Sequence, residues 1–401
     1  MEAAGRFSWA RIRPDERAAL LLGFVFHFMV LASYYLIRPL RDAIGLEGGA
    51  GGLQWLFTAT FVVMLLIVPL FGALVSRLPP PRFIPLVYRG VALTMIVFGV
   101  LIAARVSPVG VGRAFFVWVS IYNLFTISIF WSVLVDRFSD EQGQRLFGFI
   151  AAGGTLGTFA GPILAACLSG ALGPLALTLV AALMLEVAVQ AYRALLRQTD
   201  PFSPARSDRT KPIGGGVLGG AMTVIRSPYL MALVLFMLLH TSAATFLYFE
   251  QGRIVASSFT DVASRTSFFA TVDLIVSALT LLIQLTLSGP FIRTFGIGVS
   301  LAALPLATLA AFTLMALNPI PLSVAFAQVL RRAVEFSIVR PAREVLWTVV
   351  SREQKYKAKN FVDTVVYRGG DAASGWVSAG VTALGASFGT LTLTLLPFLG
   401  I

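Results

Sequence analysis

The stretch 18–40, AALLLGFVFHFMVLASYYLIRPL, contains no Asp, Glu, Lys or Arg before Arg38. At 1.5 Å per residue, a helix of roughly 20 apolar residues crosses the hydrocarbon layer of a bilayer. Inside that layer no water satisfies the backbone, so such a run must be helical. Similar runs recur along the chain: 57% of its 401 residues are hydrophobic and only 12% are charged, too few to cover a water-facing surface. We therefore predict an all-α membrane protein.

Apolar runs and polar gaps together predict twelve transmembrane helices. They lie near 18–40, 53–76, 84–105, 113–135, 147–170, 174–196, 228–250, 264–288, 297–317, 320–341, 360–384 and 386–401. The widest polar gap, 197–227, is rich in Pro, Gly, Ser and charge and predicts a cytoplasmic linker. It separates an N-terminal six-helix half, 1–196, from a C-terminal six-helix half, 228–401. Basic residues gather in alternate connections, so the positive-inside rule places both termini in the cytoplasm. We expect a bacterial inner-membrane protein.

The two halves repeat each other in sequence. Ser139-Asp140-Glu141-Gln142 has its counterpart in Ser351-Arg352-Glu353-Gln354, and at the same offset Arg145 aligns with Lys357. Duplicated halves around a central site are how many transporters alternate access to that site. The repeat therefore predicts two pseudo-symmetric halves.

Two connections carry a further signal. The segments 72–77 (GALVSR) and 289–293 (GPFIR) follow the second and eighth predicted spans. They resemble the glycine-arginine loop of the major facilitator superfamily, with Ser76 where that motif usually has Asp. The resemblance implies the fold of that superfamily.

The net charge of +12 does not indicate a nucleic-acid partner, because the basic residues are spread over short loops. The only cysteine, Cys167, has no neighbours in sequence of the metal-binding types. The sequence also holds no Walker-type loop, no metal-ligand cluster and no nucleophile elbow. We expect no nucleic acid, no cofactor, no metal and no enzymatic activity.

A charge inside a span costs at least about 2.5 kcal/mol, so such positions indicate function. Arg38 follows Tyr34 and Tyr35 by one helical turn and precedes a bend at Pro39. An arginine beside aromatic rings is suited to hold an anion by hydrogen bonding and stacking. For Arg41, a side chain that snorkels to the membrane surface is an equal alternative.

The second half holds more intramembrane charges. Arg331 and Glu335 are four residues apart, so they share a helix face and can pair. His240 is either a proton relay or a packed histidine with a backbone partner. Asp273 is either a proton-coupling carboxylate or the partner of an arginine. Glu250 is the natural ionic partner of an arginine in the first span.

These considerations give three predicted groups. The substrate-binding group is Tyr34, Tyr35, Arg38, Arg41, Tyr248, Glu250, Arg253, Arg331, Arg340 and Arg368. The groups that couple protons or form ion pairs are His240, Asp273, Glu335 and Asp371. The cytoplasmic gate is Asp136, Arg145, Arg343, Glu344, Glu353, Lys357 and Asp363. For the lysines of this gate, positive-inside topology alone is an equal explanation.

Small residues predict close helix packing in the fifth span. Gly153, Gly154, Gly157 and Gly161 fall on nearly one face of that helix. Spacings of three and four between glycines let helices approach each other closely.

A longer resemblance covers the end of the chain. Arg340-Pro341-Ala342-Arg343-Glu344 and the block from Glu353 to Arg368 resemble the corresponding block of the ATP/ADP antiporter family. Arg41-Asp42 is similar to the Lys-Asp pair that follows the first span in that family. The resemblance implies the same twelve-helix fold and an anionic substrate. It makes four residues candidate functional positions: Arg41, Glu344, Lys357 and Asp363.

We therefore predict a monomeric secondary active transporter that moves a small anionic organic solute across the lipid bilayer by alternating access. Nucleotide-like exchange and proton coupling both remain open. The alternatives are a siderophore transporter of the same fold and a flippase for an anionic lipid head group. A membrane enzyme would need a cluster of His, Asp or Ser at one membrane face, which the sequence lacks.

Overall fold

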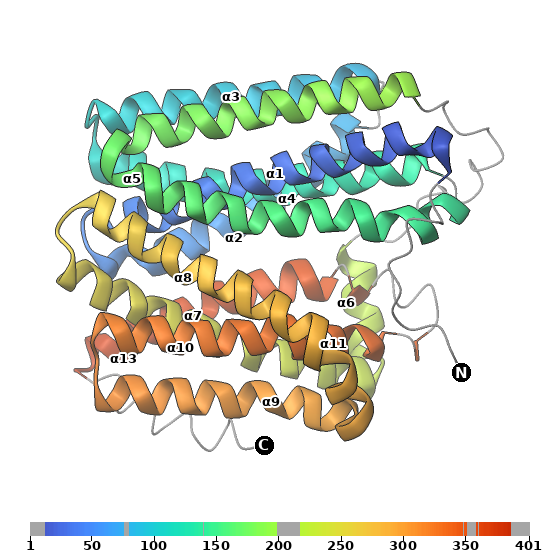
Figure 1. Ribbon diagram of the computed structural model, residues 1–401. Helices are drawn as coiled ribbons and strands as arrows, with labels where there is room; N and C mark the ends of the chain where they lie inside the picture. Colours follow the sequence, from blue (N-terminus) through green and yellow to red (C-terminus); the bar gives the residue numbers. More distant parts are fainter. Residues whose placement is uncertain are drawn as a thin grey trace. The chain divides into compact units, whose positions relative to one another are not determined.

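A computed structural model describes residues 13–75, 80–138, 140–198, 217–347, 349–350, 358–359 and 361–385. Within these ranges the regular structure is helical, and no strand occurs (Figure 1). The α-helices are α1 (Arg17–Gly45), α2 (Leu53–Val75), α3 (Pro80–Ala103), α4 (Pro108–Arg137), α5 (Asp140–Gln198), α6 (Val217–Ile225), α7 (Pro228–Ser258), α8 (Val262–Ile283), α9 (Gly289–Leu317), α10 (Pro321–Val334), α11 (Arg340–Leu346) and α13 (Tyr367–Ala383). In the described part of the chain, three π-helical turns lie at Gln284–Ser288, Glu335–Val339 and Val362–Val366.

Among the described residues, seven helical stretches are long and apolar enough to cross a membrane. The chain is therefore an integral membrane protein. The predicted spans from 18–40 to 360–384 fall on these helices and on α10, α11 and α13, with edges shifted by a few residues. The last predicted span, 386–401, lies outside the described residues, so the count of twelve stays a prediction.

Two of the seven stretches are too long for a single crossing. The 59 residues of α5 would extend about 88 Å as one straight helix, against about 30 Å of hydrocarbon. Gly173 breaks it with φ 69° and ψ −178°, and Gly296 breaks α9 with φ 76° and ψ 175°. Glycine adopts this backbone readily because it has no Cβ. The breaks fall between pairs of predicted spans.

The helices form two compact units that interleave in sequence. The first unit comprises 1–38, 71–106 and 118–210, and the second comprises 39–70, 107–117 and 211–401. The predicted halves, 1–196 and 228–401, differ from these units because the end of α1, most of α2 and the start of α4 pack in the second unit. Within the predicted linker, α6 is helical, and its Val224 packs against Leu230 of α7.

The glycine face of α5 packs against α1 in the first unit, as the sequence predicted. A Cβ added at Gly157 would lie 2.6 Å from the carbonyl oxygen of Phe28. One added at Gly161 would lie 2.7 Å from both the oxygen of Ala32 and the nitrogen of Leu36. Because these neighbours are backbone atoms, they cannot move aside as a side chain can.

We expect Gly161→Ala to destabilise the protein by about 1–3 kcal/mol, since the added methyl group overpacks the α1–α5 contact. Gly170→Ala in the same helix is the matched control, because a Cβ there meets nothing within 4 Å. Thermal unfolding of both variants in detergent measures the difference. Equal midpoints for the two variants would contradict the close packing.

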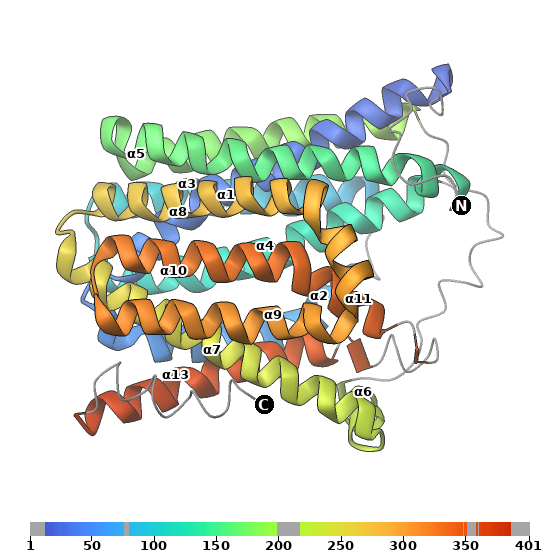
Figure 2. The same cartoon turned by 60° about the horizontal axis from the view of Figure 1, so that its bottom comes forward.

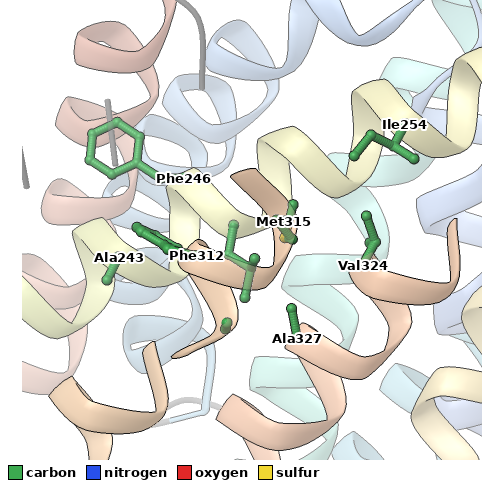
Figure 3. Packing of buried hydrophobic residues seen from close by; sticks show 9 residues of the cluster. Ala243, Phe246, Ile254, Phe312, Met315, Val324 and Ala327 are labelled. Carbon is green, nitrogen blue, oxygen red and sulfur yellow. The ribbon is translucent and has the colours of Figure 1, made fainter. Parts of the chain in front are cut away.

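The core of the second unit joins α7, α9 and α10. Figure 3 shows Phe246 and Ile254 of α7 among side chains of the other two helices, Phe312, Met315 and Val324. Figure 2 shows α10 between α8 and α9, and α10 packs on both. This packing fixes the helices that carry the charged residues described below.

The start of α8 is set by a side-chain cap. The exposed carboxylate of Asp261 accepts a 2.7 Å hydrogen bond from the backbone N–H of Ser264, which the first turn of a helix leaves unpaired. Hydrogen bonds from Ser264 favour the ionised carboxylate and hold the pKa of Asp261 below its ordinary value. The cap therefore fixes where the chain re-enters a helix after α7.

Candidate functional site

A π-helical turn lies where α10 meets α11, and it begins at Glu335. Such a turn shifts the hydrogen-bond register and is frequent at functional sites. Two side chains of the π-turn after α8 contact its backbone. Gln284 donates to the carbonyl oxygen of Phe336 at 3.0 Å, and Ser288 donates to that of Ser337 at 2.5 Å. The two π-turns therefore stabilise each other.

Three charged or ionisable side chains meet beside this turn. The Nη1 atom of Arg331 donates to Oε2 of Glu335 at 3.3 Å, and Nε2 of His240 lies 2.9 Å from Oε1 of the same carboxylate. Nη2 of Arg331 contacts Nδ1 of His240 at 3.3 Å and donates to its backbone oxygen at 3.1 Å. The side chains of His240 and Arg331 are 2% and 3% exposed. These residues form one buried centre, which we call the Glu335 centre.

The contacts of the Glu335 centre assign the proton on the histidine. A guanidinium only donates hydrogen bonds, so Nδ1 of His240 must accept from Arg331. A neutral imidazole then carries its proton on Nε2, the atom that faces Glu335. The 2.9 Å separation there suits a hydrogen bond, although its angles do not. The carboxylate of Glu335 thus contacts both Arg331 and His240.

The predicted pairing of Arg331 with Glu335 is confirmed. The predicted alternatives for His240 were a proton relay and a packed histidine with a backbone partner. The structure places it against two charged side chains, and the proton relay stays a prediction. A packed histidine with a backbone partner does occur at His27, whose Nδ1 lies 3.0 Å from the carbonyl oxygen of Ile150. Its ring stacks on Phe130 with centroids 4.1 Å apart.

A second buried ion pair is formed by the next residue of α10, Arg332. Arg332 donates to Oδ1 of Asp273 on α8 at 2.7 Å, and the two side chains are 12% and 4% exposed. Of the two predicted roles for Asp273, the structure therefore shows the ion pair. Consecutive arginines of α10 thus bind two different helices, α7 and α8.

A third buried group is the carboxylate of Asp371 on α13. Its Oδ1 atom accepts hydrogen bonds from the hydroxyls of Thr241 at 2.5 Å and Thr245 at 2.9 Å. Arg368 lies farther away, 3.6 Å from Oδ2. Tyr367 lies within electrostatic reach of both Asp371 and Glu335, so the two acidic groups belong to one region of the second unit.

In the first unit the predicted contact between Arg38 and an aromatic ring is confirmed. The guanidinium of Arg38 lies 5.8 Å from the ring centre of Tyr35. Tyr35 makes an edge contact with Tyr34 at 5.3 Å between ring centres, and Tyr34 makes one with Tyr122 at 6.0 Å. Arg38 is half-buried.

In the second unit, Arg41 donates to Oδ1 of the buried Asp42 at 2.6 Å and stacks on Phe116 at 4.7 Å. Tyr248 donates to the same carboxylate oxygen at 2.9 Å. Arg41 is therefore not simply a snorkelling side chain. The site prediction included Arg41 and Tyr248 but omitted Asp42, which joins them.

The expected pairing of Glu250 with an arginine of the first span is wrong. Glu250 instead binds Arg253 on the same helix at 3.2 Å. Arg253 also donates to the hydroxyl of Thr382 on α13 at 2.5 Å. Glu250 and Arg253 are three residues apart, so they lie on the same face of α7 and can pair without a partner from another helix.

The predicted cytoplasmic gate is only partly described. Glu344 binds Lys359 at 2.5 Å, and Arg343 lies 3.0 Å from the sulfur of Met237. Asp363 of this gate is exposed, and so is Arg340, which belongs to the predicted substrate-binding group. Glu353, Lys357 and the side chain of Asp136 lie outside the described residues.

Arg145, the remaining member of the predicted gate, binds the buried Glu16 in the first unit at 2.8 Å and 3.0 Å. Gln142 contacts the same carboxylate at 3.2 Å. The sequence prediction missed Glu16. Its signal was a pair of acidic residues, Asp15 and Glu16, just before the first apolar run.

The helices define an integral membrane protein, and its fold is shared with solved structures of membrane transporters. Among solved structures, the chain is similar to a bacterial homologue of the iron transporter ferroportin in the inward-facing state, with 14% identity over 98% of each chain and a TM-score of 0.66. It is also similar to a POT family transporter in complex with 5-aminolevulinic acid, with 12% identity, a TM-score of 0.65 and coverage of 95% of this chain and 94% of that one. The nucleoside transporter NupG is 14% identical, with a TM-score of 0.59 and coverage of 97% and 96%. No protein-family model and no curated protein matches the chain.

Proposed function

We propose that this protein is a secondary active transporter that moves a small anionic organic solute together with protons, by alternating access. The observation that carries the proposal is the Glu335 centre, in which a buried arginine is neutralised by a carboxylate that also contacts a histidine. Intramembrane ionisable groups mark substrate pathways and proton relays.

Glu335 and a substrate anion compete for Arg331, and this competition couples proton binding to anion binding. With Glu335 ionised, its carboxylate occupies the guanidinium of Arg331, so this arginine is not available to a substrate anion. Protonation of Glu335 removes its negative charge and leaves Arg331 buried without a counter-charge, which is costly. An anion then restores neutrality. Proton binding and anion binding therefore favour each other, and the linkage is reciprocal.

Further features support an anionic solute. Arg368 is held only weakly by Asp371, and Arg38 presents a half-buried guanidinium beside Tyr35. The resemblance to the ATP/ADP antiporter family and the likeness to NupG favour a nucleotide-like anion as the first candidate. The arrangement of basic residues supports an inner-membrane protein with cytoplasmic termini, and we propose that it acts as a monomer.

The test is uptake into proteoliposomes under an imposed inward proton gradient. The panel comprises labelled ATP and ADP, phosphorylated metabolites and carboxylates, with a dye that reports internal pH. We expect one anion class to accumulate together with internal acidification, and Arg331→Gln to abolish both. Arg226→Gln, which alters an exposed arginine of the second unit, is the matched control.

Two outcomes would decide against parts of the proposal. Uptake of labelled ADP that needs ATP inside the vesicle and ignores the proton gradient would show exchange in place of proton coupling. Wild-type uptake by Arg331→Gln, or uptake of a neutral solute with no response to any anion, would overturn the anion site.

A further inference from the structure

Two threonines of α7 differ from several other helical threonines in where their hydroxyls point. A helical threonine commonly donates its hydroxyl to the carbonyl oxygen four residues earlier. Several in this protein do so: Thr58, Thr94, Thr126, Thr266, Thr271 and Thr286. Thr241 and Thr245, which share one face of α7, instead direct their hydroxyls at a single carboxylate oxygen of Asp371 on α13.

The seam between α7 and α13 is lined with oxygen atoms. Next to Asp371, the Thr241 hydroxyl also lies 3.4 Å from the backbone oxygen of Tyr367. One turn further, Ser374 donates to the hydroxyl of Ser242 at 2.8 Å. Asp371, Thr241 and Thr245 are 6%, 0% and 2% exposed, so water does not solvate these oxygens.

Close helix packing brings these oxygens together. Gly370 precedes Asp371, and a Cβ there would lie 2.5 Å from Cγ2 of Thr241. A larger residue at 370 would displace the side chain of Thr241 or push α7 away from α13. The oxygen cluster therefore depends on a glycine at this position.

We propose that Asp371, Thr241 and Thr245, with the carbonyl oxygen of Tyr367, form a binding site for a monovalent cation, Na⁺. Oxygen ligands without nitrogen or sulfur suit hard cations and not zinc or copper. A single carboxylate balances one positive charge, which disfavours Ca²⁺. Hydroxyls accept as well as donate, so the threonine oxygens that now face the carboxylate can turn their lone pairs to an ion.

The neighbouring arginine gives the site a role in transport. Arg368 lies 3.6 Å from Asp371, and its side chain is 32% exposed, so it is a weak partner that a bound cation replaces. A cation on Asp371 then releases Arg368 to bind a substrate anion. This consequence rests on the proposed transport of an anion, whereas cation binding itself does not.

The test measures Na⁺ binding to the full-length protein purified in detergent, without any transport step. The midpoint of thermal unfolding, followed by tryptophan fluorescence, is recorded against Na⁺ with choline replacing it at constant ionic strength. We expect a saturable rise with Na⁺ and none with K⁺, together with saturable binding of ²²Na⁺. Asp371→Asn should abolish both signals, and Thr245→Val should weaken the affinity at least about tenfold.

Thr266→Val is the matched control, since Thr266 is fully buried but donates to the carbonyl oxygen of Val262 in its own helix. It should bind Na⁺ as the wild type does. Equal stabilisation by Na⁺, K⁺ and choline with no saturable ²²Na⁺ binding by the wild type would overturn the proposal, whether or not the variants fold. So would unchanged Na⁺ binding by Asp371→Asn. Anion uptake by a protein that fails to bind Na⁺ would leave the transporter proposal standing.

Discussion

Glu335→Gln is expected to lower proton-driven accumulation of the substrate anion on the order of 100-fold, the effect of losing one charge from a buried pair. Glutamine has the shape of protonated glutamate and leaves Arg331 without a counter-charge at every pH. The anion therefore still binds Arg331 but brings no proton with it. We expect counterflow exchange between equal anion concentrations to persist, and its dependence on pH between 5 and 8 to flatten.

The measurement pairs uptake under a proton gradient with counterflow in the same proteoliposomes. Glu186→Gln is the control: Glu186 also binds an arginine, Arg89 at 2.6 Å, but both side chains are exposed, at 38% and 44%. It should retain both activities. Accumulation by Glu335→Gln at the wild-type rate would remove this carboxylate from the coupling mechanism.

Asp273→Ala is expected to destabilise the protein by about 3–5 kcal/mol, because Arg332 stays largely buried after its counter-charge is removed. The single substitution leaves an uncompensated charge between α8 and α10. Removing both charges with Asp273→Leu and Arg332→Met should restore most of the stability, since apolar side chains of similar volume often replace a buried ion pair well.

Unfolding of each variant in detergent, induced by denaturant or by heat, measures both changes in stability. Glu186→Ala breaks an exposed ion pair and should change stability by no more than about 1 kcal/mol. A double variant as unstable as Asp273→Ala would show that the packing around the pair, and not the unpaired charge, determines the loss.

The sequence predicted those features that depend on short-range spacing. Apolar runs marked the spans, and Gly173 lay between two of them. The spacing of four residues predicted the pair of Arg331 and Glu335. In each case the residues that form the feature lie within one helix or one turn. Their spacing along the chain is therefore enough to predict it.

Contacts between helices far apart in sequence could not be predicted in the same way. His240 lies 91 residues before Arg331, and nothing in either segment states which faces of α7 and α10 meet. The bonds from Thr241 and Thr245 to Asp371 depend likewise on how α7 and α13 pack. The Glu250 prediction failed for the opposite reason: the partner was sought in the distant first span, although Arg253 lies one turn away on the same helix.

The π-turn at Glu335–Val339 makes the length of this segment significant. A π-turn holds one residue more than an α-helix of the same rise, so it behaves as a single-residue insertion that the helix has absorbed. Deleting one residue there would remove the bulge and restore regular α-helical hydrogen bonding. The carbonyl oxygens of Phe336 and Ser337, which accept from Gln284 and Ser288, would then change position. Evolution can therefore change side chains in this segment more freely than it can change their number.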